Sequence, residues 1–229
     1  MKNHKPCIDS DGLCIKMGTC RKQISQMRCK DFYVELISDI IKEPTAIAKW
    51  ESLYGVQDWA EIFKLPFTVT FETDIQSLQY KIIHRFFPCN YTLSIWFRDI
   101  SRECSSCLPE IESDTLEHYF IHCKQVVPFW KKFEEMWKSV YKIWFPLTDL
   151  DILFGIRNSM HIDNIDTLNC CILLSKMYIF KAKNSSVTIS FQIFKSLLKE
   201  KLELLRYIDT QNARLDTFLD KWGPLLNTV

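Results

Sequence analysis

Four side chains that can bind a metal ion lie in one short segment near the middle of this chain. They follow the pattern Cys-x2-Cys-x10-His-x4-Cys and are Cys104, Cys107, His118 and Cys123. A CxxC pair places two sulfurs on one tight turn, and the loop that follows is long enough to bring a second pair back to them. Three thiolates and one imidazole at this spacing can close a tetrahedral zinc site. The pattern therefore predicts a structural zinc module in the middle of the chain.

Other interpretations of these cysteines are weaker. The chain has 10 cysteines, so a CxxC pair can arise as two buried or free thiols without a metal. A redox-active CxxC usually opens a helix after a strand, and no βαβ pattern is visible. A catalytic zinc is disfavoured because four protein ligands leave no open position for water.

The identity of the fourth ligand is ambiguous. His122 directly precedes Cys123, and on a continuous helix His122 shares a face with His118 whereas Cys123 does not. Choosing Cys123 therefore requires a break or kink in this stretch. Pro128 is typical of a helix start and indicates such a break. We choose Cys123, with His122 as the alternative.

Composition points to a helical protein in a reducing compartment. Glycine is scarce, with 5 among 229 residues, and long apolar stripes have a helical period. The N-terminus lacks the apolar segment of a secretory signal, and Leu168–Leu174 is too short to span a bilayer. Ten cysteines without a signal favour thiols and metal over disulfides, so we expect a cytoplasmic or nuclear protein with no membrane contact.

The predicted fold class is all-α, a helical bundle-like assembly around the zinc module. We expect a basic, weakly ordered tail over residues 1–29, an N-terminal helical region over 30–100, the zinc-binding module over 101–127 and a C-terminal helical region over 128–229. Within these regions a helical period begins at Asp31. The run DWAEIFKLPF predicts a short helix, and the alternating FTVTFET that follows predicts an extended segment.

Several motifs in sequence order resemble one known family. The runs LQYKIIHRFFPCN, CSSC, DTLEHYFIHC and PFWKKFE are similar to the C-terminal region of LINE-type non-LTR retrotransposon reverse transcriptases. KDFYVELI, EPTAIAKWES and DWAEIFKLPF upstream, and DILFGI and ILLSKMYIFKAKN downstream, extend the resemblance over most of the chain, roughly residues 30–200. The family's Cys-Cys-His-Cys motif falls on the four residues named above, which supports Cys123 over His122. The resemblance implies that this region engages nucleic acid.

Candidate nucleic-acid contacts are the basic residues on three predicted helices. RNA or single-stranded DNA is the ligand class that we expect. A solvated helix face is the alternative interpretation of each set, and exposed aromatic residues nearby would favour binding, because bases stack on them. The first set is Lys81, His84 and Arg85, the second is Lys131, Lys132, Lys138 and Lys142, and the third is Lys176, Lys181 and Lys183.

Two departures from the family shape the functional prediction. The loop between Cys107 and His118 is acidic and has no lysine or arginine. The chain also has no Asp-Asp dipeptide, whereas a polymerase needs paired aspartates to hold its two metal ions. We therefore expect a non-catalytic zinc- and nucleic-acid-binding fragment and no enzyme. The alternative is an α-helical protein-interaction scaffold with structural zinc, which the net charge of +1 favours.

Overall fold

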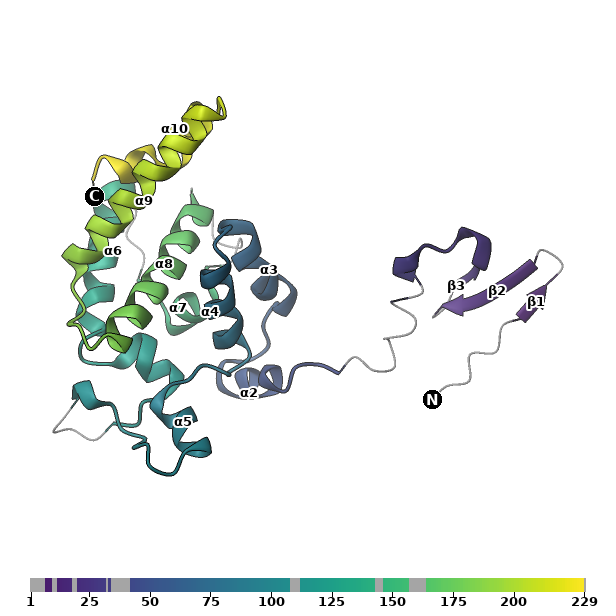
Figure 1. Cartoon of the computed structure of the whole chain (residues 1–229), viewed down its shortest axis with the longest axis horizontal. Helices are drawn as coiled ribbons and strands as arrows, with labels where there is room; N and C mark the ends of the chain where they lie inside the picture. Colours follow the sequence, from purple (N-terminus) through teal and green to yellow (C-terminus); the bar gives the residue numbers. More distant parts are fainter. Residues whose placement is uncertain are drawn as a thin grey trace. The chain divides into compact units, whose positions relative to one another are not determined.

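The computed structural model describes residues 7–9, 12–17, 20–31, 33, 42–107, 112–142, 146–156 and 164–228. The chain divides into two compact units, Met1–Thr45 and Ala46–Val229, which are drawn in Figure 1. Most of the helix expected from Asp31 onwards lies outside the described residues.

The first unit contains a small antiparallel sheet. Its strands are β1 (Cys7–Asp9), β2 (Gly12–Met17) and β3 (Cys20–Gln23), in the order β1-β2-β3, and the short helix η1 (Ile24–Gln26) follows. The sequence predicts no regular structure in residues 1–29, so the strands are a correction. They were missed because strands of three to six residues are too short to show a period.

The second unit is helical, and the all-α prediction is confirmed there. The segment that carries the predicted metal ligands lies between α5 and α6, near the middle of the chain. The helices are α2 (Thr45–Tyr54), α3 (Trp59–Val69), α4 (Thr73–Ile83), α5 (Asn90–Trp96), η2 (Ser105–Cys107), the π-helix η3 (His118–His122), α6 (Val127–Tyr141), α7 (Asp149–Phe154), α8 (Ile165–Asn184), α9 (Phe191–Gln211) and α10 (Leu215–Leu226).

Helix α8 forms the centre of this unit. It packs against α3 and α4, while α6 packs against α9 and α10 (Figure 1). Apolar side chains such as Leu168, Ile172 and Ile179 are buried along its length, as expected for a helix that is covered on most of its faces. Across the described parts of the chain, no helix combines the length and apolar character needed to cross a membrane.

Helix α3 continues through the segment that was expected to be extended. Its last turns include Pro66 and end at Val69, so the prediction of a strand-like FTVTFET is wrong for its first three residues. Ile62, Pro66 and Val69 form a helical stripe that is buried against the core. Burial of this stripe outweighs the hydrogen bond that a proline removes from a helix.

A cluster of aromatic side chains packs against the metal-binding segment. Phe87, just after α4, contacts the rings of Tyr119 and Phe120 in η3 and of Phe180 in α8, at centroid distances of 4.8, 4.8 and 5.6 Å. The indole N–H of Trp130 in α6 donates to the Phe120 carbonyl at 2.7 Å. These contacts fix η3 to the helical core independently of any ion.

Candidate metal centre

The first two predicted ligands lie on a tight turn. Cys104 directly precedes the one-turn helix η2 and Cys107 is its last residue, and the Cys107 N–H donates to the Cys104 carbonyl. A bridge between Glu103 and Ser113 closes the loop behind the turn, and the Cys104 N–H donates to the Glu112 carbonyl at 2.9 Å. The backbone thus returns the chain to the turn before η3 begins.

A π-helix supplies the other two ligands. The Cys123 N–H donates to the His118 carbonyl at 2.9 Å, an i→i+5 bond that widens the turn, and Cys123 then leaves the helix with φ −59° and ψ 135°. The wider turn and the helix end bring Cys123 to the same side as His118, which an α-helix would not do. This is the break that the choice of Cys123 required.

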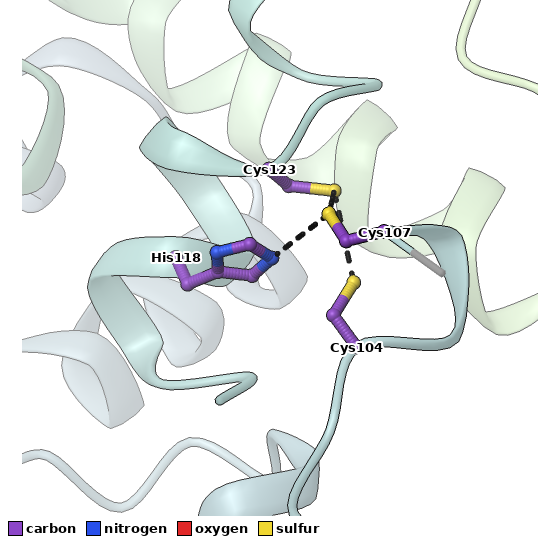
Figure 2. A group of neighbouring side chains, drawn as sticks. All are labelled: Cys104, Cys107, His118 and Cys123. Atoms are coloured by element: carbon purple, nitrogen blue, oxygen red, sulfur yellow. Dashed lines mark hydrogen bonds between the residues drawn. The ribbon is translucent and has the colours of Figure 1, made fainter. Parts of the chain in front are cut away.

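The four side chains meet in one buried cluster, shown in Figure 2. Their ligand atoms all lie within 4.8 Å of one another. The Cys123 sulfur lies 3.8 Å from the sulfurs of both Cys104 and Cys107, and the Cys107 sulfur lies 3.4 Å from His118 Nε2. The prediction that these four residues come together is confirmed, and the group can hold a metal ion.

His122 is not part of this cluster. Its side chain is 53% exposed, and its Nε2 lies 3.1 Å from the Asp149 carboxylate at the start of α7. The alternative choice of His122 as fourth ligand is therefore wrong. On η3 the two histidines diverge because the turn contains an extra residue.

Burial sets the protonation of the ligands. The pKa of the Cys104 thiol is raised to about 12, mainly by burial and also by the charge of Cys123, while the backbone N–H of Ser106 and the charge of Lys183 act to lower it. Burial lowers the pKa of His118, as does Lys183, whereas Asp114 and Glu112 raise it. In the metal-free protein, burial therefore favours the neutral thiol of Cys104 and the neutral imidazole of His118, and a divalent ion must displace the Cys104 proton when it binds.

Glu112 orients the ligating histidine. One of its carboxylate oxygens lies 2.9 Å from His118 Nδ1, so the other ring nitrogen, Nε2, faces the sulfurs. This carboxylate–histidine pair fixes the tautomer and the ring plane, as is common around bound metals. The sequence showed Glu112 only as part of an acidic loop, and its role becomes visible from the fold.

We expect Glu112→Gln to weaken metal affinity by about 10- to 100-fold, because the amide holds the imidazole less firmly and does not increase its basicity. Competition with a chromogenic chelator measures the change. Glu103→Gln is a suitable control, since Glu103 is exposed and its side chain is not a partner of His118. Equal affinities for both variants would contradict a role of Glu112 in ligand orientation.

The structure separates the predicted basic residues into different environments. Lys81 is exposed, whereas the His84 ring lies against Tyr80. Arg85 pairs with Glu117 at 2.8 Å and lies over the Trp50 ring, so it holds the fold together.

The set on α6 lies on the solvent side of its helix. Lys131, Lys132 and Lys138 are exposed there, and exposed Glu135 lies among them. Lys142 is also exposed, and its ammonium donates to the Ser139 carbonyl at the end of α6.

Lys176 is the clearest correction in the third set. Its side chain is 1% exposed, and its ammonium donates to the Gln79 side chain and to the Leu153 carbonyl. In this fold Lys176 cannot reach a phosphate. Lys181 is exposed, and Lys183 is half-buried beside the metal centre, where its ammonium donates to the Tyr119 carbonyl at 3.0 Å.

Two of the three sets share one part of the surface. Lys81 of α4 and Lys181 of α8 line the same depression, together with Pro88. Pro88 also lines the cavity that Lys183 borders. No pattern in the sequence indicates this grouping, because the two helices are almost a hundred residues apart.

Next to this depression along the chain lies a pair of aromatic residues that the sequence analysis did not identify. Phe86 and Trp96 are 60% and 50% exposed, and their rings are 5.3 Å apart. Trp96 belongs to α5, a helix without a buried residue. In the sequence, the one signal that could have identified this pair is that its apolar side chains have no other helix to pack against.

Comparison with known proteins leaves the chain without an assigned family. No protein-family model matches the sequence, and no curated protein has a significant match to it.

Proposed function

We propose that the Cys104/Cys107/His118/Cys123 cluster binds one structural Zn²⁺. A tetrahedral zinc with Zn–S bonds of about 2.3 Å separates its sulfurs by about 3.8 Å. Two of the sulfur–sulfur distances in the cluster are 3.8 Å. A set of three thiolates and one imidazole favours zinc over hard cations such as magnesium or calcium. Four protein ligands fill the coordination sphere, so the ion would hold the fold and would not activate water.

We further propose that the chain is a non-catalytic module that binds RNA or single-stranded DNA. This proposal rests on the surface formed by Lys81, Lys181 and Lys183 near Pro88. The exposed Phe86–Trp96 pair lies on the neighbouring residues of the same chain. We call the lysines and this pair together the lysine–aromatic surface. Single-stranded nucleic acid is bound by such combinations, in which cations follow the phosphates and bases stack on aromatic rings. The relationship to the C-terminal region of LINE-type reverse transcriptases is part of the same proposal and rests on the motifs alone.

A salt titration of a fluorescent uridine heptamer tests this proposal. We expect the logarithm of the affinity to fall with the logarithm of salt concentration between about 50 and 200 mM. Lys181→Gln should reduce the slope by about 0.7, since it removes one phosphate contact to a single strand. Trp96→Ala should weaken binding by roughly tenfold with little change in slope, because stacking is uncharged. Fluorescence anisotropy gives both quantities.

Lys64→Gln and Phe71→Ala are matched controls. Lys64 and Phe71 are exposed residues outside the lysine–aromatic surface, so both variants should bind as the wild type does. If the wild-type protein does not bind the heptamer at low salt, the nucleic-acid proposal fails.

The protein-interaction scaffold remains a second proposal because of an apolar groove. The groove has a volume of about 470 Å³ and lies between the α3–α4 connection and helices α9 and α10. Phe71 stands at its edge with 97% of its surface exposed, and Phe218 and Trp222 also line it. Exposed apolar surface of this kind is common at protein interfaces. Two results together would favour the scaffold. The wild-type protein would not bind the heptamer, and it would capture a protein partner that the Phe71→Ala variant does not capture.

A further inference from the structure

A polar cavity of about 300 Å³ lies directly beside the metal centre. Its volume is at the lower end of those of ligand pockets in proteins, roughly 300 to 1,000 Å³. One metal ligand, Cys104, forms part of the wall, and the end of α8 forms another part. Its polar lining residues include Asn90, Asp114, Tyr119, Gln125, Lys183 and Asn184.

Two of these residues are buried and carry a polar atom without a hydrogen-bond partner. Asp114 and Tyr119 are more than nine-tenths buried, yet Asp114 Oδ1 and the Tyr119 hydroxyl are both unpaired. The other oxygen of Asp114 accepts from the Asn90 N–H at 3.2 Å. Buried polar atoms in folded proteins nearly always have a partner, so two such atoms around one cavity point to a group that enters it.

Lys183 contributes a positively charged hydrogen-bond donor to the cavity, whereas Asp114 contributes an acceptor. Its ammonium lies over the Tyr119 ring at 4.1 Å and donates to the Tyr119 carbonyl, which leaves further N–H groups for another acceptor. Burial raises the pKa of Asp114, and the Asn90 N–H and the charge of Lys183 offset part of this rise. The cavity therefore offers a carboxylate that needs an N–H donor and an ammonium that needs an acceptor.

Among the four bases of RNA, guanine fits this arrangement best. Its N1–H and N2–H groups lie side by side and can face a carboxylate, while the neighbouring O6 can face an ammonium. Adenine and cytosine would place an acceptor ring nitrogen beside the carboxylate. Uracil has one N–H, at N3, and would place its O2 carbonyl where guanine places the 2-amino group. An acceptor against a buried carboxylate is repulsive, so the cavity selects against these bases.

We propose that this cavity receives a guanine base of a single-stranded nucleic acid, with Asp114 accepting from its N–H groups and Lys183 donating to O6. This inference rests on the proposed nucleic-acid binding and gives it a base preference. The cavity borders the lysine–aromatic surface, since Pro88 and Lys183 belong to both. A strand that follows the lysines can thus place one base beside the zinc module.

The test compares heptamers of equal charge bound to the zinc-loaded full chain. We expect a uridine heptamer with one central guanosine to bind roughly 10- to 100-fold more tightly than the all-uridine heptamer. Central inosine, which lacks the 2-amino group, should lose much of this gain, and central adenosine should lose all of it. Asp114→Asn should remove the preference, while Asp220→Asn, which removes the same charge at an exposed position, should retain it.

The outcomes separate the two proposals. If the all-uridine heptamer binds with the expected salt dependence and guanosine adds nothing, the cavity proposal is overturned while the nucleic-acid proposal stands. If neither heptamer binds, both fall. Zinc content of Asp114→Asn checks that the module is intact, and the guanosine–inosine comparison on the wild-type protein decides the matter even if that variant does not fold.

Discussion

Replacing Cys107 with serine is expected to remove the metal ion and to unfold the loop between α5 and η3. Structural zinc sites contribute on the order of 10 kcal/mol to the folding of small modules at pH 7. Apart from the cysteine ligands, the described part of that loop has one buried apolar residue, Leu116, and one isolated bridge. A serine hydroxyl binds zinc poorly, so the loss should approach the full contribution of the ion.

Metal analysis and amide hydrogen exchange measure this effect. The wild-type protein should contain one zinc per chain, and Cys107→Ser should contain none. Exchange should accelerate in residues 101–117 and much less in η3 and α8, since contacts with the helical core hold these two elements without the ion. A chelator added to the wild-type protein should produce the same exchange pattern.

His122 provides the matched control for this experiment. His122→Gln should retain the full zinc content because the imidazole of His122 faces Asp149 rather than the sulfurs. Cys123→Ser should behave as Cys107→Ser does. The reverse result, with zinc lost in His122→Gln and kept in Cys123→Ser, would show that the ligand set is wrong.

The second large effect expected is a rise in stability between pH 7 and pH 9 that depends on Lys176. Burial lowers the pKa of the Lys176 ammonium from 10.5 to about 7. Between these values the unfolded chain binds a proton that the folded chain does not, so the free energy of unfolding increases with pH. The increase is about 1.4 kcal/mol per pH unit, or about 2 kcal/mol over this range. The cost of the buried charge is fully present below pH 7.

Comparison with Lys176→Met isolates this contribution. Methionine fills a similar volume without a charge, and the curve of stability against pH should become flatter by about 2 kcal/mol from pH 7 to pH 9. Burial also raises the pKa values of the Cys170 and Cys171 thiols, which acts in the opposite direction near pH 9. Because these thiols and the metal site are present in both proteins, their effects cancel in the difference.

Urea unfolding at each pH supplies the measurements. Lys181→Met is the control, since Lys181 is an exposed lysine on the same helix and its removal should leave the pH dependence as in the wild type. Parallel curves for the wild type and Lys176→Met would mean that Lys176 remains charged in the folded protein, and the expected linkage would then be absent.

The helices followed from the sequence wherever an apolar stripe was long. The three predicted helices that carry the basic sets are found as α4, α6 and α8, because a helical period of buried residues leaves few alternatives for packing. Short elements were less predictable. The three strands of the first unit and the end of α3 were missed, since their conformation depends on pairing or burial that a short run of residues does not encode.

The sequence by itself determined which residues can bind the metal, because thiols and an imidazole at this spacing are a local property of one segment. Only the tertiary structure decided between Cys123 and His122, through the i→i+5 turn of η3. It also decided that Lys176 is buried while Lys81 and Lys181 share a depression. The physical reason is that burial and proximity between distant helices arise from the packing of the whole core, and a charge pattern along one helix does not contain that information.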